Sequence, residues 1–159
     1  MSPLKLTALI QIFSLLKVPL LGILRPKVVH LTATQSRIRL PLSHLAKNHV
    51  GSMYFGALAI GAELSVALKV VDSMQNDKTP VNFIFKDFSC QFLQRAEGAT
   101  DFCCDEVPQI QALIDKALAT QERVEGKFNG YACPRGAGRD EQLMTYQLTL
   151  SIKSTKKRK

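Results

Sequence analysis

Glu63 is the side chain of this sequence best placed to do chemistry. Burial without a partner is costly for a carboxylate and raises its pKa, which suits a general base acting on water near neutral pH. The carboxylate could also attack an electrophilic carbon directly. A structural interpretation stays open, in which Glu63 caps a loop or pairs across a subunit interface. The prediction rests on the residues three and four positions away on a helix, which are all apolar: Ala59, Ile60, Val66 and Ala67.

The residues before Glu63 supply further candidates. Asn48 carries a donor and an acceptor and could orient a water or a carbonyl group, or it could be an N-cap or turn residue. The amides of Phe55 and Gly56, at the positive end of a helix, would suit a developing oxyanion. Gly51 and Gly56 would let a ligand approach the backbone closely. Tyr54 could donate a hydrogen bond, narrow a ligand slot, or fill an apolar interface.

A long apolar helix must position these residues. Between Met53 and Val71 the only charged residues are Glu63 and Lys69, so a helix over 52–71 must be buried on most sides. One long buried helix combined with a run of antiparallel strands predicts an α+β fold whose sheet wraps around the helix. The alternation of apolar residues predicts strands over 28–33, 37–42, 81–86, 88–94, 100–104, 123–133 and 143–154, a surface helix over 108–120, a loop over 72–80 and a hairpin turn at 136–140.

The N-terminal segment is apolar but too often interrupted to cross a bilayer. Lys5 and Lys17 leave no uncharged run near the roughly 20 residues that a span requires. Spacings of three and four residues between apolar side chains predict an amphipathic helix that ends near Pro19. This helix would pack on its own domain or a partner subunit, or make peripheral contact with a membrane. The predicted organisation is an N-terminal helix in 1–25, one domain in 26–154 and a basic tail in 155–159.

Composition narrows the class of partner. Lys and Arg total 21 and Asp and Glu total 13, a formal charge of +8 that suits an anionic partner. No recognition helix, aromatic-basic RNA motif or zinc finger is present, so no nucleic-acid partner is predicted. Cys90, Cys103, Cys104 and Cys133 contain no CxxC pair, and no secretory signal is apparent. Reduced thiols in a cytoplasmic protein, with no metal site, are therefore expected.

The run from Asn48 to Leu58 resembles a motif of hotdog-fold thioesterases of the phenylacetate-pathway type. In those proteins an Asn lies six residues before a His-Gly-Gly, and an acidic residue follows that His by nine. Here Asn48 takes the first position, Tyr54-Phe55-Gly56 replaces His-Gly-Gly, and Glu63 takes the acidic position. The wording of the run is most similar to a thioesterase-like branch of that superfamily, and the likeness covers roughly residues 15 to 153.

The resemblance implies a hotdog fold with an additional N-terminal helix. It also implies an acyl-CoA thioesterase, with coenzyme A as part of the substrate and no other cofactor. A homodimer or dimer of dimers is implied, in which Asn48 and Glu63 of one site come from different chains. The change to Tyr54-Phe55-Gly56 removes an imidazole and introduces bulk. A hotdog protein that binds acyl-CoA or fatty acyl groups without hydrolysis is therefore the alternative.

Overall fold

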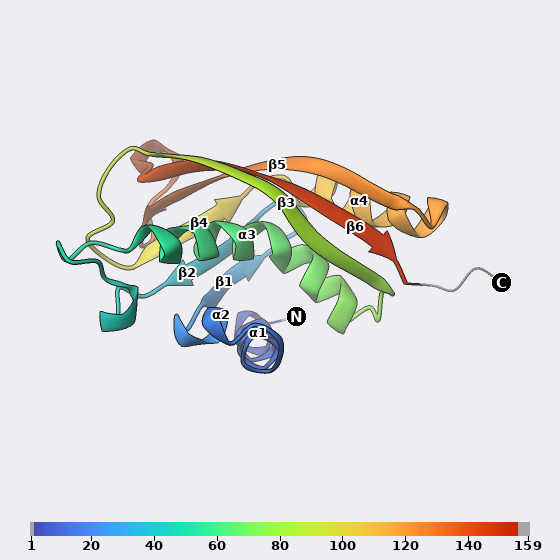
Figure 1. Ribbon diagram of the computed structural model, residues 1–159, viewed down its shortest axis with the longest axis horizontal. Coiled ribbons are helices and arrows are strands. Elements are labelled where there is room, and N and C mark those ends of the chain that lie inside the picture. Colours follow the sequence, from blue (N-terminus) through green and yellow to red (C-terminus); the bar gives the residue numbers. More distant parts are fainter. Residues whose placement is uncertain (1, 156–159) are drawn as a thin grey trace.

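A long helix, α3 (Phe55–Gln75), lies at the centre of the molecule with an antiparallel sheet curled over it (Figure 1). The computed structural model describes residues 2–155, with the side chains of residues 13–17 left aside. More than half of the α3 residues are buried, because the helix is apolar nearly all round and meets the sheet on several sides. This arrangement is the hotdog fold, and it confirms the predicted α+β class.

The sheet has six strands in the order β1-β2-β4-β5-β6-β3, and every neighbouring pair is antiparallel. Inward-facing residues alternate with outward-facing ones along each strand, so one face packs on α3 and the other is more polar. Strands β1 and β3 form the two edges. The strands are β1 (Lys27–Leu31), β2 (Ser36–Leu40), β3 (Val81–Phe92), β4 (Thr100–Cys104), β5 (Arg123–Pro134) and β6 (Met144–Ser154).

Gly61 and Phe102 make the closest contact between α3 and the sheet. A Cβ atom added at Gly61 would lie 2.3 Å from the Phe102 ring, so only glycine allows the ring to pack there. Phe102 is fully buried. Four residues further along α3, Ser65 Oγ lies 2.7 Å from the hydroxyl of buried Tyr146 on β6. These two contacts hold α3 against β4 and β6.

A second helix, α4 (Val107–Thr120), follows β4 and covers part of the same side of the sheet. Its apolar stripe of Ile110, Leu113, Ile114 and Ala117 is buried in the main core, as expected for an amphipathic surface helix. The turn between β5 and β6 contains Gly136, whose positive φ of 78° favours glycine, and a short 3-10 helix, η2 (Arg139–Glu141).

The N-terminal segment forms two helices rather than one. Helix α1 (Pro3–Lys17) ends where predicted, but Pro19 then begins α2 (Pro19–Ile23), because proline suits the first position of a helix. Leu21 and Leu24 of this second segment are buried and hold it on the domain. Within the described residues, no helix is both long and apolar enough to cross a membrane. Residues 156–159 of the predicted basic tail lie outside the description.

The largest differences from the predicted boundaries are at the end of α3 and along β3. Helix α3 continues through residues 72–75, where a loop was predicted, because half-buried Met74 extends the apolar face and the amide of Asn76 bonds to Asp72 O at 2.9 Å. The strands predicted over 81–86 and 88–94 are one strand, β3. Its register against β6 shifts between Phe85 and Asp87, and such a bulge absorbs the residue that breaks the alternation.

Candidate active site

Glu63 lies near the middle of α3 and faces a cavity of about 1000 Å³. Among the described residues, its carboxylate accepts no hydrogen bond and forms no ion pair. Burial raises the pKa of Glu63 above its ordinary value, because a charged carboxylate loses hydration there. The structure therefore places this residue as the sequence predicted, on an apolar surface and without a charged partner among the described side chains.

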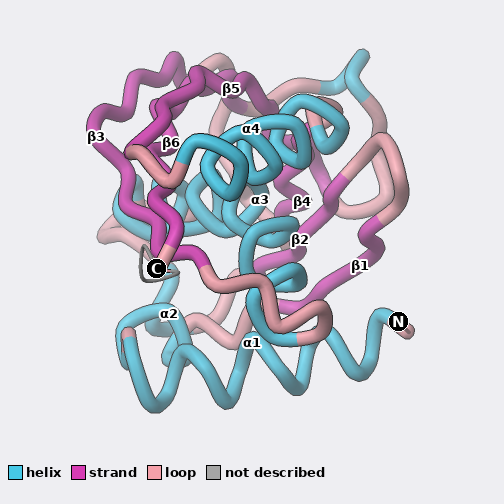
Figure 2. The backbone as a smooth tube through the Cα atoms, turned by 90° about the vertical axis from the view of Figure 1, so that its right-hand side faces the viewer, coloured by secondary structure: helices cyan, strands magenta, loops and turns pink. Residues whose placement is uncertain are grey.

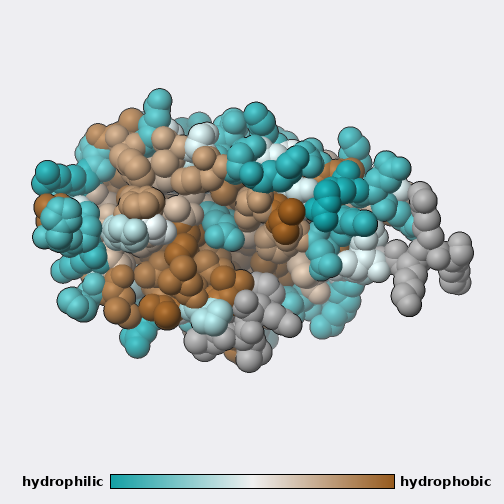
Figure 3. Space-filling view, viewed as in Figure 1, coloured by the Kyte–Doolittle hydropathy of each residue, from teal (hydrophilic) through white to brown (hydrophobic). Residues whose placement is uncertain are grey.

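The cavity runs between α3, β3 and the N-terminal helices. Phe83, Phe85 and Phe88 of β3 form an aromatic wall, and Val18 and Leu21 line it from the side of α2. In the space-filling view, brown surface covers the parts of this face where β3 and α2 lie (Figure 3). Such a slot can hold an apolar chain while a reacting polar group lies at Glu63.

Asn48 belongs to the loop before α3, which also holds the 3-10 helix η1 (His44–Ala46). Its side chain closes a local turn: Oδ1 accepts from the amides of Val50 and Ser52, each at 3.1 Å, and Nδ2 donates to Ser52 Oγ at 2.9 Å. These hydrogen bonds are the ones expected if Asn48 is a turn residue. The second hydrogen of Nδ2 has no acceptor among the described residues, so one donor remains for another molecule. The catalytic role of Asn48 stays a prediction.

Tyr54 and Phe55 lie at the exposed start of α3. The Tyr54 side chain is 48% exposed and that of Phe55 61%, and their ring centroids are 4.8 Å apart. A Cβ atom added at Gly56 would lie 2.5 Å from the Tyr54 ring. The space that glycine leaves at this position is therefore filled by Tyr54, not open to a ligand from the same side. Gly51, with φ of 84°, has open space around it.

The amides that open α3 have no protein acceptor. No side chain caps the helix, and among the described residues the N–H groups of Phe55 and Gly56 make no hydrogen bond. Free amides and the positive end of the helix dipole together favour a negative oxygen. The predicted oxyanion position therefore has suitable donors, next to the exposed Tyr54 and Phe55 rings.

Within one chain these candidates do not meet. Glu63 follows Phe55 by eight residues, about 12 Å along a helix axis. Neither Asn48 nor any residue of Tyr54-Phe55-Gly56 lines the Glu63 cavity. A complete site that uses all of them requires a second chain.

Sequence reasoning missed the walls of the cavity. The aromatic wall has a local signal, because Phe83 and Phe85 alternate along one face of a strand that follows the helix directly. The contributions of Ile10, Val18 and Leu21 had no such signal, since they depend on how the N-terminal helices fold back onto α3.

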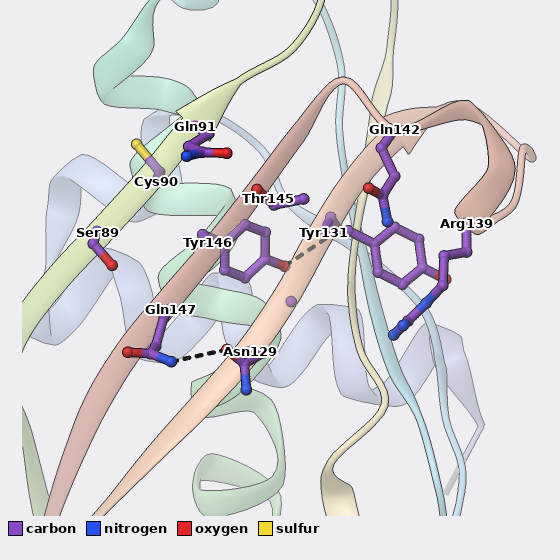
Figure 4. Close-up of a pocket in the computed structure, with 11 residues that line it drawn as sticks. Ser89, Cys90, Gln91, Asn129, Tyr131, Arg139, Gln142, Thr145, Tyr146 and Gln147 are labelled. Carbon is purple, nitrogen blue, oxygen red and sulfur yellow. Dashed lines mark hydrogen bonds between the residues drawn. The ribbon is translucent and has the colours of Figure 1, made fainter.

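A second hollow of about 460 Å³ lies on the other face of the sheet, over β3, β5 and β6 (Figure 4). Ser89 lines it, whereas the adjacent Phe88 lines the Glu63 cavity, as expected for neighbouring residues of a strand. Two pairs of its side chains interact: Gln147 Nε2 donates to Asn129 Oδ1 at 2.9 Å, and Arg139 lies over the Tyr131 ring. No Asp, Glu or His side chain lines this hollow.

By its fold the molecule is a hotdog protein. Among solved structures, a Pseudomonas aeruginosa protein of unknown function described as a probable thioesterase is 21% identical, with a TM-score of 0.71 over 93% of this chain and 95% of that one. A Chlorobaculum tepidum protein of unknown function is 10% identical, with a TM-score of 0.80 over 97% and 98%. A thioesterase from Haemophilus influenzae is 11% identical, with a TM-score of 0.66 over 92% and 91%.

The family assignment comes from sequence. A family model described as "Domain of unknown function (DUF4442)" matches residues 7–121, and the chain belongs to this family. None of the curated proteins matches the chain. The narrower likeness to the phenylacetate-pathway type stays a prediction.

Proposed function

We propose that this protein hydrolyses acyl thioesters of coenzyme A, as a homodimer. The observation that carries the proposal is the unpaired Glu63 carboxylate, with its raised pKa, facing an apolar cavity of about 1000 Å³. An apolar slot suits an acyl chain, and an unpaired carboxylate suits the activation of water. The hotdog fold, shared with proteins described as thioesterases, supports the same activity by analogy.

In the proposed reaction, the Glu63 carboxylate takes a proton from a water molecule whose oxygen attacks the thioester carbon. The resulting oxyanion lies at helix-start amides such as those of Phe55 and Gly56. When the carbon–sulfur bond breaks, the thiolate takes up the proton and leaves as coenzyme A thiol, and the acyl group leaves as a carboxylic acid. Direct attack by Glu63, through a mixed anhydride that water then cleaves, is the other route.

A dimer through β3 would bring the separated candidates together. Strand β3 is a 12-residue sheet edge that pairs, among the described strands, with β6 alone, and Ile84, Phe88 and Phe92 on it are exposed. Long apolar edges of this kind pair readily with another strand. In such a dimer the start of α3 from the partner subunit would approach Glu63, and the free donor of the partner subunit's Asn48 could orient the water. Light scattering on the purified chain gives the solution mass, and a monomer would contradict this arrangement.

Binding without hydrolysis is the second candidate function. The Tyr54 ring packs over Gly56, where the resembling enzymes have the smallest residue, and it occupies space beside the helix-start amides. A ring held there could close the oxyanion position while leaving the apolar cavity available. In that case, acyl-CoA or fatty acids would bind but would not be cleaved.

One experiment separates the two functions. Thiol release is measured across acyl-CoA chain lengths for the wild type, for Glu63→Gln and for Glu97→Gln, a matched change at an exposed carboxylate. We expect Glu63→Gln to lower kcat/KM by about 100-fold or more, and Glu97→Gln to leave it unchanged. Thermal stabilisation by acyl-CoA without thiol release, in the wild type, would instead establish the binding function.

Tyr54 is tested in the same assay. Tyr54→Phe removes only the hydroxyl, and Tyr54→Ala removes the ring from Gly56. Loss of turnover in both variants would assign the hydroxyl a role in the reaction. A gain of turnover in Tyr54→Ala alone would show that the ring obstructs the oxyanion position.

A further inference from the structure

Helices α1 and α2 lie next to each other along one side of the molecule (Figure 2). Two hydrogen bonds fix α1 to the start of the sheet: the amide of Val28 donates to Thr7 Oγ1 and Gln11 Nε2 donates to Pro26 O, both at 2.9 Å. The side chains that face the domain are buried in an apolar cluster with β1, β2 and α3. They are Leu6, Ile10 and Leu21.

The opposite face of these helices is also apolar. Leu4, Ala8 and Ile12 follow one another at four-residue intervals and form one exposed stripe on α1, with Leu4 81% and Ile12 60% exposed. On α2, Leu20 is 61% and Ile23 48% exposed. A helix that packs on its domain needs only one apolar face, so a second one indicates a second contact.

The segment that forms this face is basic. Residues 1–62 contain seven Lys and Arg residues and no Asp or Glu, so this segment carries most of the formal charge of +8. Lys5 lies beside the stripe on α1, and Arg25 and Lys27 follow α2 directly. All three are exposed, and none forms an ion pair with a described residue.

We propose that this outer face, made of Leu4, Ile12, Leu20 and Ile23 with Lys5 and Arg25, binds the surface of an anionic lipid bilayer. Exposed aliphatic side chains flanked by Lys and Arg suit the boundary between headgroups and acyl chains. A second copy of the chain is the less suitable occupant. Two such faces would bring their basic side chains together, and like charges across an interface are unfavourable.

The proposed membrane face adjoins the Glu63 cavity. Val18, at the junction of α1 and α2, is partly exposed and also lines that cavity, together with Ile10 and Leu21. A molecule bound through this face would hold one wall of the cavity beside the bilayer, where acyl chains are concentrated. The proposal does not depend on hydrolysis, because a protein that only binds acyl groups would have the same face.

Flotation of the full chain with lipid vesicles tests the proposal. Vesicles of phosphatidylcholine alone are compared with vesicles that also contain phosphatidylglycerol. We expect flotation with the anionic vesicles that weakens as salt is added. Lys5→Gln combined with Arg25→Gln should lower the affinity roughly 25-fold, at about a fivefold loss per basic residue. Leu4→Ser combined with Leu20→Ser should abolish flotation, whereas Leu93→Ser, at an exposed leucine beyond β3, should not.

A fluorescence measurement covers the case in which the serine variant does not fold. The chain has no tryptophan, so a single introduced one reports without background. Leu20→Trp should shift its emission to the blue on addition of anionic vesicles, because the indole enters the apolar layer. Ala119→Trp, on the exposed end of α4, should show no shift.

Two results would overturn the proposal. One is equal or absent flotation with both vesicle types, together with no emission shift in Leu20→Trp. The other is a wild type that does not bind lipid and has a larger solution mass than the Leu4→Ser, Leu20→Ser variant. A second copy of the chain would then cover the face. If the wild type floats with anionic vesicles but releases no thiol from acyl-CoA, the proposed hydrolysis is contradicted and the proposed membrane face is not.

Discussion

Asp101 is fully buried and Glu63 is half-buried, and the surroundings of the two carboxylates differ completely. Asp101, on β4, is 0% exposed and bonds to two guanidinium groups: Arg39 Nε at 2.6 Å and Arg37 Nε at 3.0 Å. The amide of Gly136 donates to it as well, at 3.0 Å. Glu63 has no such partner among the described residues. The Asp101 carboxylate holds β2, β4 and the turn at Gly136 together, whereas the Glu63 carboxylate joins no two elements among the described residues.

The pKa values shift in opposite directions for this reason. Burial alone would raise the pKa of Asp101, but the hydrogen bonds from Arg39 and Gly136 and the two positive charges hold it below its ordinary value. Burial acts unopposed at Glu63 and raises its pKa. A buried carboxylate with partners indicates a structural role, and one without them is a candidate for a role in which a proton moves.

Removing the charge of Asp101 should have the largest effect on stability. Asp101→Asn leaves Arg37 and Arg39 partly buried without a counter-ion, and we expect a loss of about 3 kcal/mol in the free energy of unfolding. Urea denaturation measures the change, with Asp140→Asn, at an exposed carboxylate of η2, as the control. Unchanged stability in Asp101→Asn would show that the ion pairs of Asp101 do not stabilise the fold.

Removing the charge of Glu63 should change the free energy of unfolding in the opposite direction. Because the pKa of Glu63 is higher in the folded state than in the unfolded state, ionisation opposes folding as the pH rises above the unfolded value. Glu63→Gln should therefore be more stable than the wild type at neutral pH, by on the order of 1 kcal/mol, or roughly 2–4 °C in Tm. The two proteins should converge in acid, where Glu63 is protonated. Thermal unfolding across a pH series checks both parts.

Asp101 should show the reverse dependence on pH. Its lowered pKa contributes stability that is present above the unfolded value and is lost as the pH falls through the folded value. The wild type should therefore lose stability in acid, while Asp101→Asn loses less. If the two proteins lost stability in parallel, the ion pairs of Asp101 would not account for the acid sensitivity.

The smallest effect is expected at Arg39. This side chain bonds to both carboxylate oxygens of Asp101, through Nε at 2.6 Å and Nη2 at 2.9 Å. Arg39→Lys keeps the charge and loses the two-point geometry, which should cost about 0.5–1 kcal/mol of stability. Double-mutant cycles with Asp101→Asn isolate the pair, and additive effects would show that the geometry contributes nothing.

Glu63 and Asp101 also differ in how far their surroundings could be predicted from sequence. The environment of Glu63 was predictable because its neighbours lie three and four residues away on one helix, so local spacing sufficed. That of Asp101 was not, since Arg37 and Arg39 precede it by more than 60 residues and meet it only through the pairing of β2 with β4. For the same reason, the fold and the candidate carboxylate were predicted, while the cavity walls from α1 and α2 were missed.

The predicted element boundaries were wrong where tertiary contacts override local sequence signals. The polar residues after Val71 predicted a loop, but Met74 reaches the core and keeps residues 72–75 helical. Pro19 predicted the end of helical structure, but it begins α2. For Asn48, composition alone allowed either a turn or a reacting group, and its three hydrogen bonds within the loop account for the first without excluding use of its remaining donor.

Gly61 carries no functional group, yet it sets the direction in which Glu63 points. The Phe102 ring lies in the notch that this glycine leaves, which fixes the rotational phase of α3 about its own axis. Because a helix turns as a rigid body, any rotation of α3 that moved Phe102 out of the notch would turn the Glu63 carboxylate, two residues later, by the same angle. The direction in which the Glu63 carboxylate points therefore depends on the absence of a side chain at position 61, and a larger residue there would turn the candidate base away without touching it.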